Sequence, residues 1–302
     1  MIDIIIPNYN GRALLPTCLA ALEAQTRQDF RLTVVDDGSH DDSLAFLAQY
    51  PTVQVLALPQ NRGLAKAVNA ALRITTGEIV VLLNNDTEAH PRWLECLVGT
   101  LERYPNYAFA ASKLLLFDKR DIFHSAGDFY QPNGVPGSRG VWEKDRGQYD
   151  ALAEVFGPCA AAAAYRRTAL ELLAVNDQIL DEDLVIYCED VDLNIRARQK
   201  GLKTIFVPQA IVYHRLSATG GGTLASYYCG RNFILVWAKN TPKALLYRSG
   251  PAFLWAQVKF ALQALWHIRE PAARARLRGQ LAGWQALPFF WRKRSTIRSL
   301  KI

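Results

Sequence analysis

Short apolar runs alternate with stretches of helical periodicity along the early part of the chain. The runs cover residues 2–6, 32–35, 53–58 and 79–83, and apolar residues recur every three or four positions over 14–22, 44–47 and 64–72. Continuous apolar strands that alternate with helices are typical of a parallel sheet covered on both faces. The pattern therefore predicts an α/β fold with a mostly parallel sheet and helices on both faces.

The later part of the chain has a different pattern. Residues 117–150 are rich in Gly, Pro, Asn and Asp, which predicts irregular structure or hairpins, and such an insert could cover a substrate groove. We expect helices near 167–175 and 190–200, short strands at 203–207 and 211–213, and helices beyond 225. The chain then divides into a main domain over 1–240 and a helical extension over 241–302.

Polar residues stand at the carboxyl ends of the predicted strands. They are Tyr9 after the first strand, Asp36-Asp37 after the second, Asn61-Arg62 after the third and Asn84-Asn85-Asp86 after the fourth. Ligands of open parallel sheets bind beyond these strand ends, so the four positions predict a binding site. The sequence has neither a G-x-G-x-x-G turn after residue 6 nor a P-loop, which argues against a dinucleotide-dependent oxidoreductase.

A second acidic cluster, Glu189-Asp190-Val191-Asp192, opens a predicted helix, and His214 ends a predicted strand. A divalent ion that bridges a diphosphate needs hard oxygen ligands and tolerates an imidazole beside them. Another carboxylate would then be free to take a proton. Structural roles stay open for the same residues: Asp36 and Asp37 could belong to a helix cap, the second cluster could be helix N-terminal acids, and a single histidine is often structural.

Six short motifs follow one another between residues 2 and 232. They are Ile6-Pro7-Asn8-Tyr9-Asn10-Gly11, Val34-Val35-Asp36-Asp37-Gly38-Ser39, Asn61-Arg62-Gly63 through Asn69, Leu82-Leu83-Asn84-Asn85-Asp86-Thr87, Asp181-Glu182 through Leu193, and Val207-Pro208 through His214. Each alone is common. In this order they resemble the family 2 glycosyltransferases of the GT-A fold, in particular the branch of bacterial rhamnosyltransferase-like enzymes.

The resemblance implies transfer of a sugar from a nucleotide-diphosphate donor to an acceptor hydroxyl, with inversion at the anomeric carbon. Residues 1–116 would form the nucleotide-sugar half of the domain, and 117–240 the acceptor and catalytic half. A UDP- or dTDP-sugar is the expected donor. The donor-binding residues that the resemblance implies are Pro7, Tyr9, Asp36, Asp37, Asn61, Arg62 and Asn85.

The resemblance also implies a Mg²⁺ or Mn²⁺ cofactor held by Asp86 and His214. The metal motif of the family is typically D-x-D or a variant whose last Asp is the ligand, and Asn84 replaces the first Asp here. Asp190 would be the general base, and Glu189 would hold an acceptor hydroxyl. The glycine-rich loop 217–222 has the composition of a lid over the diphosphate.

Positive charge is concentrated near the end of the chain. The formal charge of the chain is +7, whereas residues 241–302 hold 12 Lys and Arg and one acidic residue, a net of +11. Tryptophans at 255, 266, 284 and 291 accompany this charge, a combination that favours an anionic membrane surface. Basic helices that dock on the core are the alternative, and no nucleic-acid recognition motif is visible.

Composition also bears on the location of the protein. No apolar run reaches the length of about 18 residues that a spanning helix needs, and no basic flank of a signal peptide precedes the first strand. The five cysteines form no C-x-x-C pair and are expected to be reduced. We therefore expect a cytoplasmic protein, peripheral at the inner face of the cell membrane, with a lipid-linked or polysaccharide acceptor in cell-surface glycan assembly.

Two other functions are compatible with parts of the sequence. A processive polysaccharide synthase is disfavoured because the chain lacks the Q-x-x-R-W motif and spanning helices. A catalytically degenerate domain, acting as a nucleotide-sugar sensor or a membrane scaffold, is the alternative that the replacement at Asn84 supports.

Overall fold

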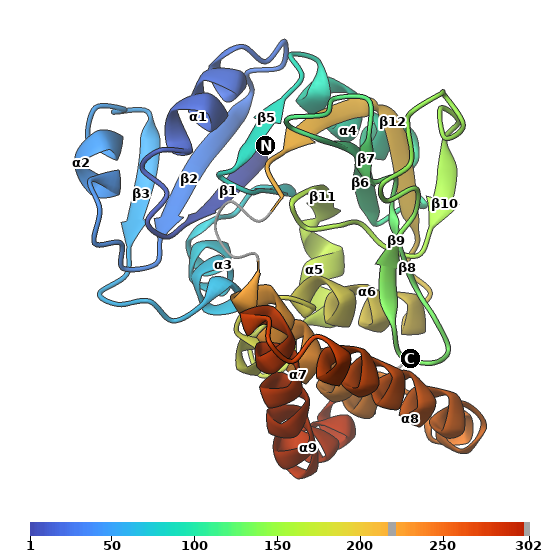
Figure 1. Cartoon of the computed structure of the whole chain (residues 1–302). Coiled ribbons are helices and arrows are strands. Elements are labelled where there is room, and N and C mark those ends of the chain that lie inside the picture. Colours follow the sequence, from blue (N-terminus) through green and yellow to red (C-terminus); the bar gives the residue numbers. More distant parts are fainter. Residues whose placement is uncertain (217–221, 299–302) are drawn as a thin grey trace.

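A single mixed sheet runs through the centre of the molecule (Figure 1). The computed structural model describes residues 1–216 and 222–298, so the predicted lid loop lies almost entirely outside the described residues. The order of the main strands is β10-β12-β6-β11-β4-β1-β2-β3. Their bounds are β1 (Ile2–Asn8), β2 (Phe30–Asp36), β3 (Val53–Ala57), β4 (Ile79–Leu83), β6 (Phe109–Leu116), β10 (Ala153–Val155), β11 (Ala162–Arg166) and β12 (Thr204–His214).

Strands β1 to β4 are parallel to one another, as the early sequence pattern predicts. The connections between them are α1 (Leu15–Glu23), α2 (Ser43–Leu47) and α3 (Leu64–Ile74). β12 is also parallel to β6, whereas β11 is antiparallel to both β4 and β6. The predicted α/β fold with a mostly parallel sheet is confirmed.

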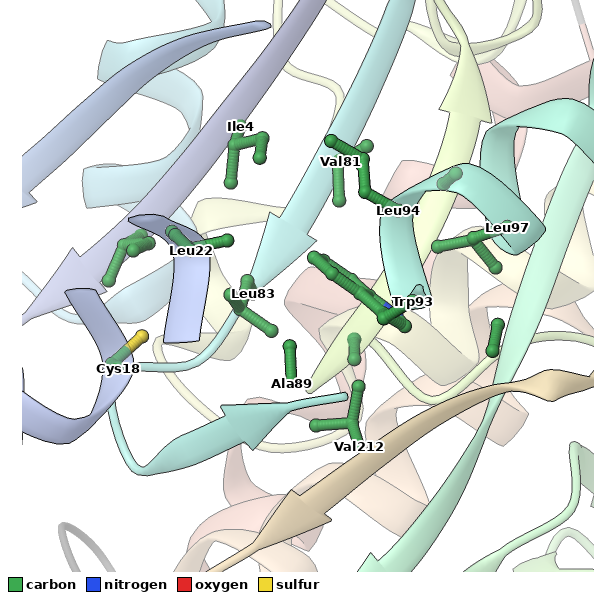
Figure 2. Packing of buried hydrophobic residues seen from close by; sticks show 14 of the residues in the cluster. Ile4, Cys18, Leu22, Val81, Leu83, Ala89, Trp93, Leu94, Leu97 and Val212 are labelled. Carbon is green, nitrogen blue, oxygen red and sulfur yellow. The ribbon is translucent and has the colours of Figure 1, made fainter. Parts of the chain in front are cut away.

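The two faces of the sheet are buried under different helices. On one face, Ile4, Val81 and Leu83 pack with α1, α2 and α4 (Trp93–Arg103). Figure 2 shows Trp93 of α4 in the middle of this layer, and its indole Nε1 donates a 2.9 Å hydrogen bond to Ser112 Oγ. On the other face, apolar residues pack with α3, α5 (Arg167–Leu173) and α6 (Glu189–Gln199). Burial on both faces explains why these strands are apolar at consecutive positions.

The two short strands expected at 203–207 and 211–213 are one strand, β12, whose register with β6 shifts between Val207 and Ile211. Pro208 lies within this irregularity, where its missing N–H removes a possible ladder hydrogen bond. The pattern alone suggested two strands because this irregular stretch interrupts the apolar run. Near its end, β12 also pairs with the short strand β5 (Thr87–Ala89).

The predicted irregular insert contains short strands. These are β7 (Phe123–Ser125), which pairs with β6, and the hairpin of β8 (Asp128–Tyr130) and β9 (Pro136–Ser138). The backbone of Asp128 also bonds to Gly157, which lies between β10 and β11. The insert is therefore joined to the main sheet at β7 and to the segment between β10 and β11 at Asp128.

Helices form the rest of the described chain. They are the 3-10 turn η1 (Glu182–Leu184) and α7 (Thr223–Asn240), α8 (Lys243–Trp266) and α9 (Pro271–Arg298), of which the last three lie together below the sheet in Figure 1. α9 crosses α7 so closely that a Cβ atom at Gly279 would overlap the backbone of Tyr227. Among the described residues, no helix is long and apolar enough to cross a membrane.

Candidate active site

Asp36 organises the first loop of the site. Because β1 and β2 are parallel with Asn8 opposite Asp36, the two side chains meet at the strand ends. Asn8 Nδ2 donates to Asp36 Oδ2 at 2.8 Å, and the backbone N–H and hydroxyl of Ser39 donate to the same carboxylate at 2.9 and 2.7 Å. The carboxylate is fully buried. The carboxylate of Asp36 therefore holds together the loop after β1 and the loop after β2. A nucleoside that contacted Asp36 would do so in addition to these protein hydrogen bonds.

Asp37 ties the end of β2 to the loop that precedes α3. Its two carboxylate oxygens accept hydrogen bonds from the backbone N–H groups of Arg62 and Gly63, at 2.9 and 2.8 Å. Burial raises the pKa of Asp37, and these amide donors oppose that rise. The structure thus brings Asp37, Asn61 and Arg62 together, as the sequence predicts. Pro7 lies near the end of β1, and Tyr9 is the first residue after this strand. Tyr9 keeps 40% of its surface exposed.

Asn85 joins the end of β1 to the predicted metal loop. Its amide Nδ2 donates to Asn8 Oδ1 at 2.7 Å, and both side chains are buried. A Cβ atom at Gly11 would overlap both of them, so this position needs a glycine. The described contacts of Asn85 are therefore to the protein, and its role in donor binding remains a prediction.

Asp86 and His214 are neighbours in space. His214 ends β12 opposite Thr87 of β5, the residue after Asp86. Asp86 Oδ1 lies 3.1 Å from His214 Nε2, and both side chains are buried. Among the described residues, no donor makes a hydrogen bond to Asp86 Oδ1. A buried carboxylate oxygen beside an imidazole nitrogen fits the ligand set of Mg²⁺ or Mn²⁺, with the remaining positions left for diphosphate oxygens.

His124 of β7 supports His214 from the other side. The Nδ1 atoms of the two rings are 2.9 Å apart, so one of them donates a hydrogen bond to the other. Burial, and then the neighbouring His214, lowers the pKa of His124 to about 3. A neutral His124 can accept a hydrogen bond from the Nδ1–H group of His214, which would leave His214 Nε2 free to bind a metal.

Asp190 stands at the N-terminus of α6 and is bound by two backbone amides. Ala160 N–H donates to Oδ2 at 3.2 Å, and Val191 N–H donates to Oδ1 at 2.8 Å. These donors favour the ionised form, as expected for a helix N-terminus, but burial outweighs them and raises the pKa of Asp190. A carboxylate whose pKa is raised is a stronger base than an ordinary aspartate.

Glu189 directly precedes Asp190 and begins α6. Its side chain is buried, and its Oε2 atom has no hydrogen-bond partner among the described residues. Burial, and then the charge of Asp190, raises the pKa of Glu189 well above its ordinary value. A carboxyl group that stays protonated can donate a hydrogen bond, which agrees with the predicted contact to an acceptor hydroxyl.

Asp192, the last acid of this cluster, has a structural role. It lies 2.9 Å from Arg196 in the same helix and 2.7 Å from Lys239 of α7. These cations lower its pKa despite complete burial. Of the three acids in the Glu189-Asp190-Val191-Asp192 cluster, Glu189 and Asp190 are thus the two that make no ion pair with a described residue and remain candidates for a catalytic role.

Asp128 is a carboxylate beside Asp190 that the sequence pattern did not indicate. Single ligand atoms of Asp128, Cys159 and Asp190 all lie within 4.8 Å of one another. The hydroxyls of Ser125 and Ser138 each donate to Asp128 Oδ1 at 2.8 Å. Burial, and then the charge of Asp190, raises the pKa of Asp128 to about 7.

The chemistry of these atoms argues against a Mg²⁺ or Mn²⁺ site at Asp128. Burial raises the pKa of the Cys159 thiol well above its ordinary value, so it stays protonated, and a thiol is a poor ligand for a hard cation. Asp86 and His214 offer the better set. The loop of Asp86 is connected to Asp190 through two neighbouring alanines. Asn84 N–H donates to Ala161 O at 2.9 Å, and Ala160 N–H donates to the carboxylate of Asp190.

Comparison with known proteins identifies the family of the chain. The family model for glycosyl transferase family 2 matches residues 3–173, more than half of the chain. The chain belongs to glycosyl transferase family 2. The matched region includes the loops of Asp36, Asp37 and Asp86, and it ends before Asp190 and His214.

Curated relatives of this family 2 chain include named glycosyltransferases. An N-acetylglucosaminyltransferase of Rhizobium meliloti is 26% identical over 70% of this chain and 50% of its own length. The amylovoran biosynthesis glycosyltransferase AmsB of Erwinia amylovora is 26% identical over 72% of this chain and 71% of its own length. The chain spans only 25, 37 and 50% of the length of three of the curated relatives that it matches, the Rhizobium meliloti enzyme among them.

Solved structures show that this family 2 chain has the GT-A fold. GalNAc-T7 with UDP, GalNAc and Mn²⁺ superposes with a TM-score of 0.63 at 16% identity, covering 79% of this chain and 48% of the other. The mannosyltransferase PcManGT of Pyrobaculum calidifontis, with GDP-Man and Mn²⁺, superposes with a TM-score of 0.58 at 18% identity, covering 99% and 85%.

Proposed function

We propose that the chain is an inverting, metal-dependent glycosyltransferase that moves a sugar from a nucleotide diphosphate to a hydroxyl of a lipid-linked or glycan acceptor in cell-surface glycan assembly. The observation that carries the proposal is the attachment of Asp190 and of the metal loop to neighbouring residues, Ala160 and Ala161. A base and a metal site held by one short segment can act on opposite sides of the transferred sugar, the base on the acceptor hydroxyl and the metal on the donor diphosphate.

The reaction follows from these positions. Asp190 takes the proton of the acceptor hydroxyl while the acceptor oxygen forms a bond to the anomeric carbon. The bond from that carbon to the diphosphate breaks on the opposite side, so the configuration inverts. When Mg²⁺ or Mn²⁺ is bound by Asp86 and His214, it neutralises the negative charge of the departing diphosphate.

The other residues have positioning roles in this proposal. The loops of Pro7, Tyr9, Asp37 and Arg62 surround the nucleoside, and Asp36 holds two of these loops together. Glu189 donates a hydrogen bond to the acceptor. We propose a UDP- or dTDP-sugar as donor and attachment to the inner face of the cell membrane, a location that suits a lipid-linked acceptor.

The test is transfer by the purified chain. A panel of nucleotide sugars is first screened for thermal stabilisation, since a ligand at 100 times its Kd adds about 2.7 kcal/mol. Donor hydrolysis and transfer are then measured with and without Mn²⁺. Asp190→Asn should keep donor binding and lower turnover about a hundredfold or more, the usual effect of losing a general base.

Asp177→Asn is the matched control, because Asp177 is an exposed carboxylate in the turn after α5. It should leave turnover unchanged. If Asp190→Asn retains turnover within a few fold of the wild type, Asp190 is not the base. Donor binding without any turnover under all conditions would instead favour the nucleotide-sugar sensor.

A further inference from the structure

Helix α8 carries a row of exposed apolar side chains. From Leu254 to Trp266 these side chains are between 45 and 87% exposed, and they are Leu254, Trp255, Val258, Leu262, Leu265 and Trp266. Their spacing of three, four and seven residues places them on one side of a helix. A continuous apolar face of this kind is uncommon on a protein surface that meets only water.

The opposite side of α8 is fixed to the protein. Phe253 is fully buried and stacks on Trp237 of α7 with a ring-centroid separation of 3.9 Å. Gln257 is also buried and accepts a 2.9 Å hydrogen bond at its backbone oxygen from Gln280 of α9. The rotation of α8 about its axis is therefore set by α7 and α9, and the row of exposed side chains points away from them.

The charge around this face is positive. The sequence from Lys243 to Trp266 contains Lys243, Arg248 and Lys259 and no Asp or Glu. The Lys259 ammonium lies 5.5 Å from the centroid of the Trp255 ring, so a cation borders the apolar row directly. Apolar side chains with two tryptophans, bordered by Lys and Arg, match the acyl boundary and the anionic headgroups of a bilayer.

We propose that the α8 face, defined as Leu254, Trp255, Val258, Leu262, Leu265 and Trp266, docks on an anionic lipid bilayer. Because its other side is buried by α7 and α9, α8 lies along the plane of the bilayer surface. The proposal extends the proposed function, since it names the surface that brings the enzyme to a lipid-linked acceptor. A second copy of the chain is the competing occupant, but it would place this positively charged helix next to an identical one.

The intact chain is tested by co-sedimentation with vesicles of equal parts phosphatidylglycerol and phosphatidylcholine, without donor or acceptor. Binding should be strong at low salt, weaker at high salt and weaker to pure phosphatidylcholine. Leu262→Glu should weaken binding about tenfold or more, because the apolar leucine side chain, which enters the apolar layer, is replaced by a charged carboxylate, which does not. Trp255→Ala, which adds no charge, should weaken it in the same direction.

The matched control is Leu172→Glu, which makes the same change at a leucine of α5 that is 49% exposed. It should bind vesicles like the wild type. Thermal unfolding of each variant tests whether it is folded. Because the substituted positions are exposed, each variant should unfold like the wild type. Failure of the intact chain to bind at low salt, or unchanged binding by Leu262→Glu, overturns the proposal.

Sedimentation velocity separates the competing occupant. A dimer that Leu262→Glu converts to a monomer, together with absent vesicle binding, would assign the face to a second copy. The vesicle-binding measurement does not depend on catalysis. Vesicle binding by a chain that transfers no sugar would contradict the proposed function and leave this inference standing.

Discussion

Asp86 offers a buried carboxylate oxygen that no described residue satisfies, and His214 places an imidazole nitrogen 3.1 Å from it. With Asn84 in place of a first carboxylate, few other protein ligands are available for an ion there. We expect Asp86→Ala and His214→Ala each to abolish most of the increase in UDP affinity that Mn²⁺ provides.

Isothermal calorimetry of UDP binding with and without Mn²⁺ measures this effect. His267→Ala is the control for the loss of an imidazole, because His267 is exposed in the turn between α8 and α9. If either site variant keeps the full Mn²⁺ enhancement, that residue is not a ligand. Should UDP bind only weakly, the calorimetry can be repeated with the nucleotide that stabilises the protein most.

Asp128 predicts a pH dependence with a defined sign. Its pKa in the folded protein is raised to about 7, so the folded state keeps a proton that the unfolded chain releases near the ordinary pKa of about 4. The unfolding free energy should therefore fall as the pH rises from about 4 to 7. Asp128→Asn should flatten this fall, and thermal unfolding across that range measures it.

The same substitution gives an expectation for catalysis. Because the charge of Asp190 helps to raise the pKa of Asp128 to about 7, Asp190 ionises first, while Asp128 is still neutral. Asp128→Asn then replaces a neutral carboxyl group with a neutral amide, so the acidic limb of kcat/KM should stay in place. Asp145→Asn is the comparison, because Asp145 lies in the same insert but pairs with Lys113. A limb that moves to lower pH in Asp128→Asn but not in Asp145→Asn would mean that Asp128 is already charged when Asp190 titrates.

Some of these residues could be predicted from the sequence and others could not. Asp86 and His214 each end a predicted strand, and their order along the chain matches a family. Asp128 and His124 lie in an insert with no periodicity, where nothing in the pattern shows which side chains point inward. Their roles depend on β7 and β8 folding back toward α6 and β12, a contact between distant segments.

At the scale of elements, α9 does more than carry charge. Phe290 is fully buried in a cluster with Leu184, Cys188 and Leu235, and Cys188 directly precedes Glu189. Lys293 of α9 also contacts Asp181 and Asp183, at 2.5 and 2.6 Å. The basic extension that the sequence predicts is helical, and its last helix packs against the segment that leads into Glu189 and Asp190.

Adjacent phenylalanines of α9 provide a matched test of this support. Phe290→Ala should lower the unfolding free energy by about 3–5 kcal/mol, as expected for a large cavity in a core. Phe289 is 51% exposed, so Phe289→Ala should change it by no more than about 0.5 kcal/mol. Chemical denaturation measures the unfolding free energy of both variants. Similar losses in the two would show that α9 is not part of the core.

At the scale of the whole molecule, the parallel half of the sheet was predictable because its strands and helices alternate locally. The central position of β11 was not. Its residues 162–164 are all alanine, which has no strand preference, and it is antiparallel to strands that are parallel to others. The orientation of α8 was also not predictable, since an apolar helix could bury either side until α7 and α9 are placed.

The place of β11 has a consequence for synthesis of the protein. β6 ends at Leu116, and all of its described partners, β7, β11 and β12, follow it in the chain. A ribosome that has made β6 has thus released an almost fully apolar strand whose two edges are both unpaired. Such edges promote association with other chains. The nascent protein is most exposed to aggregation between the synthesis of β6 and that of β11, a vulnerability that the buried centre of the finished sheet conceals.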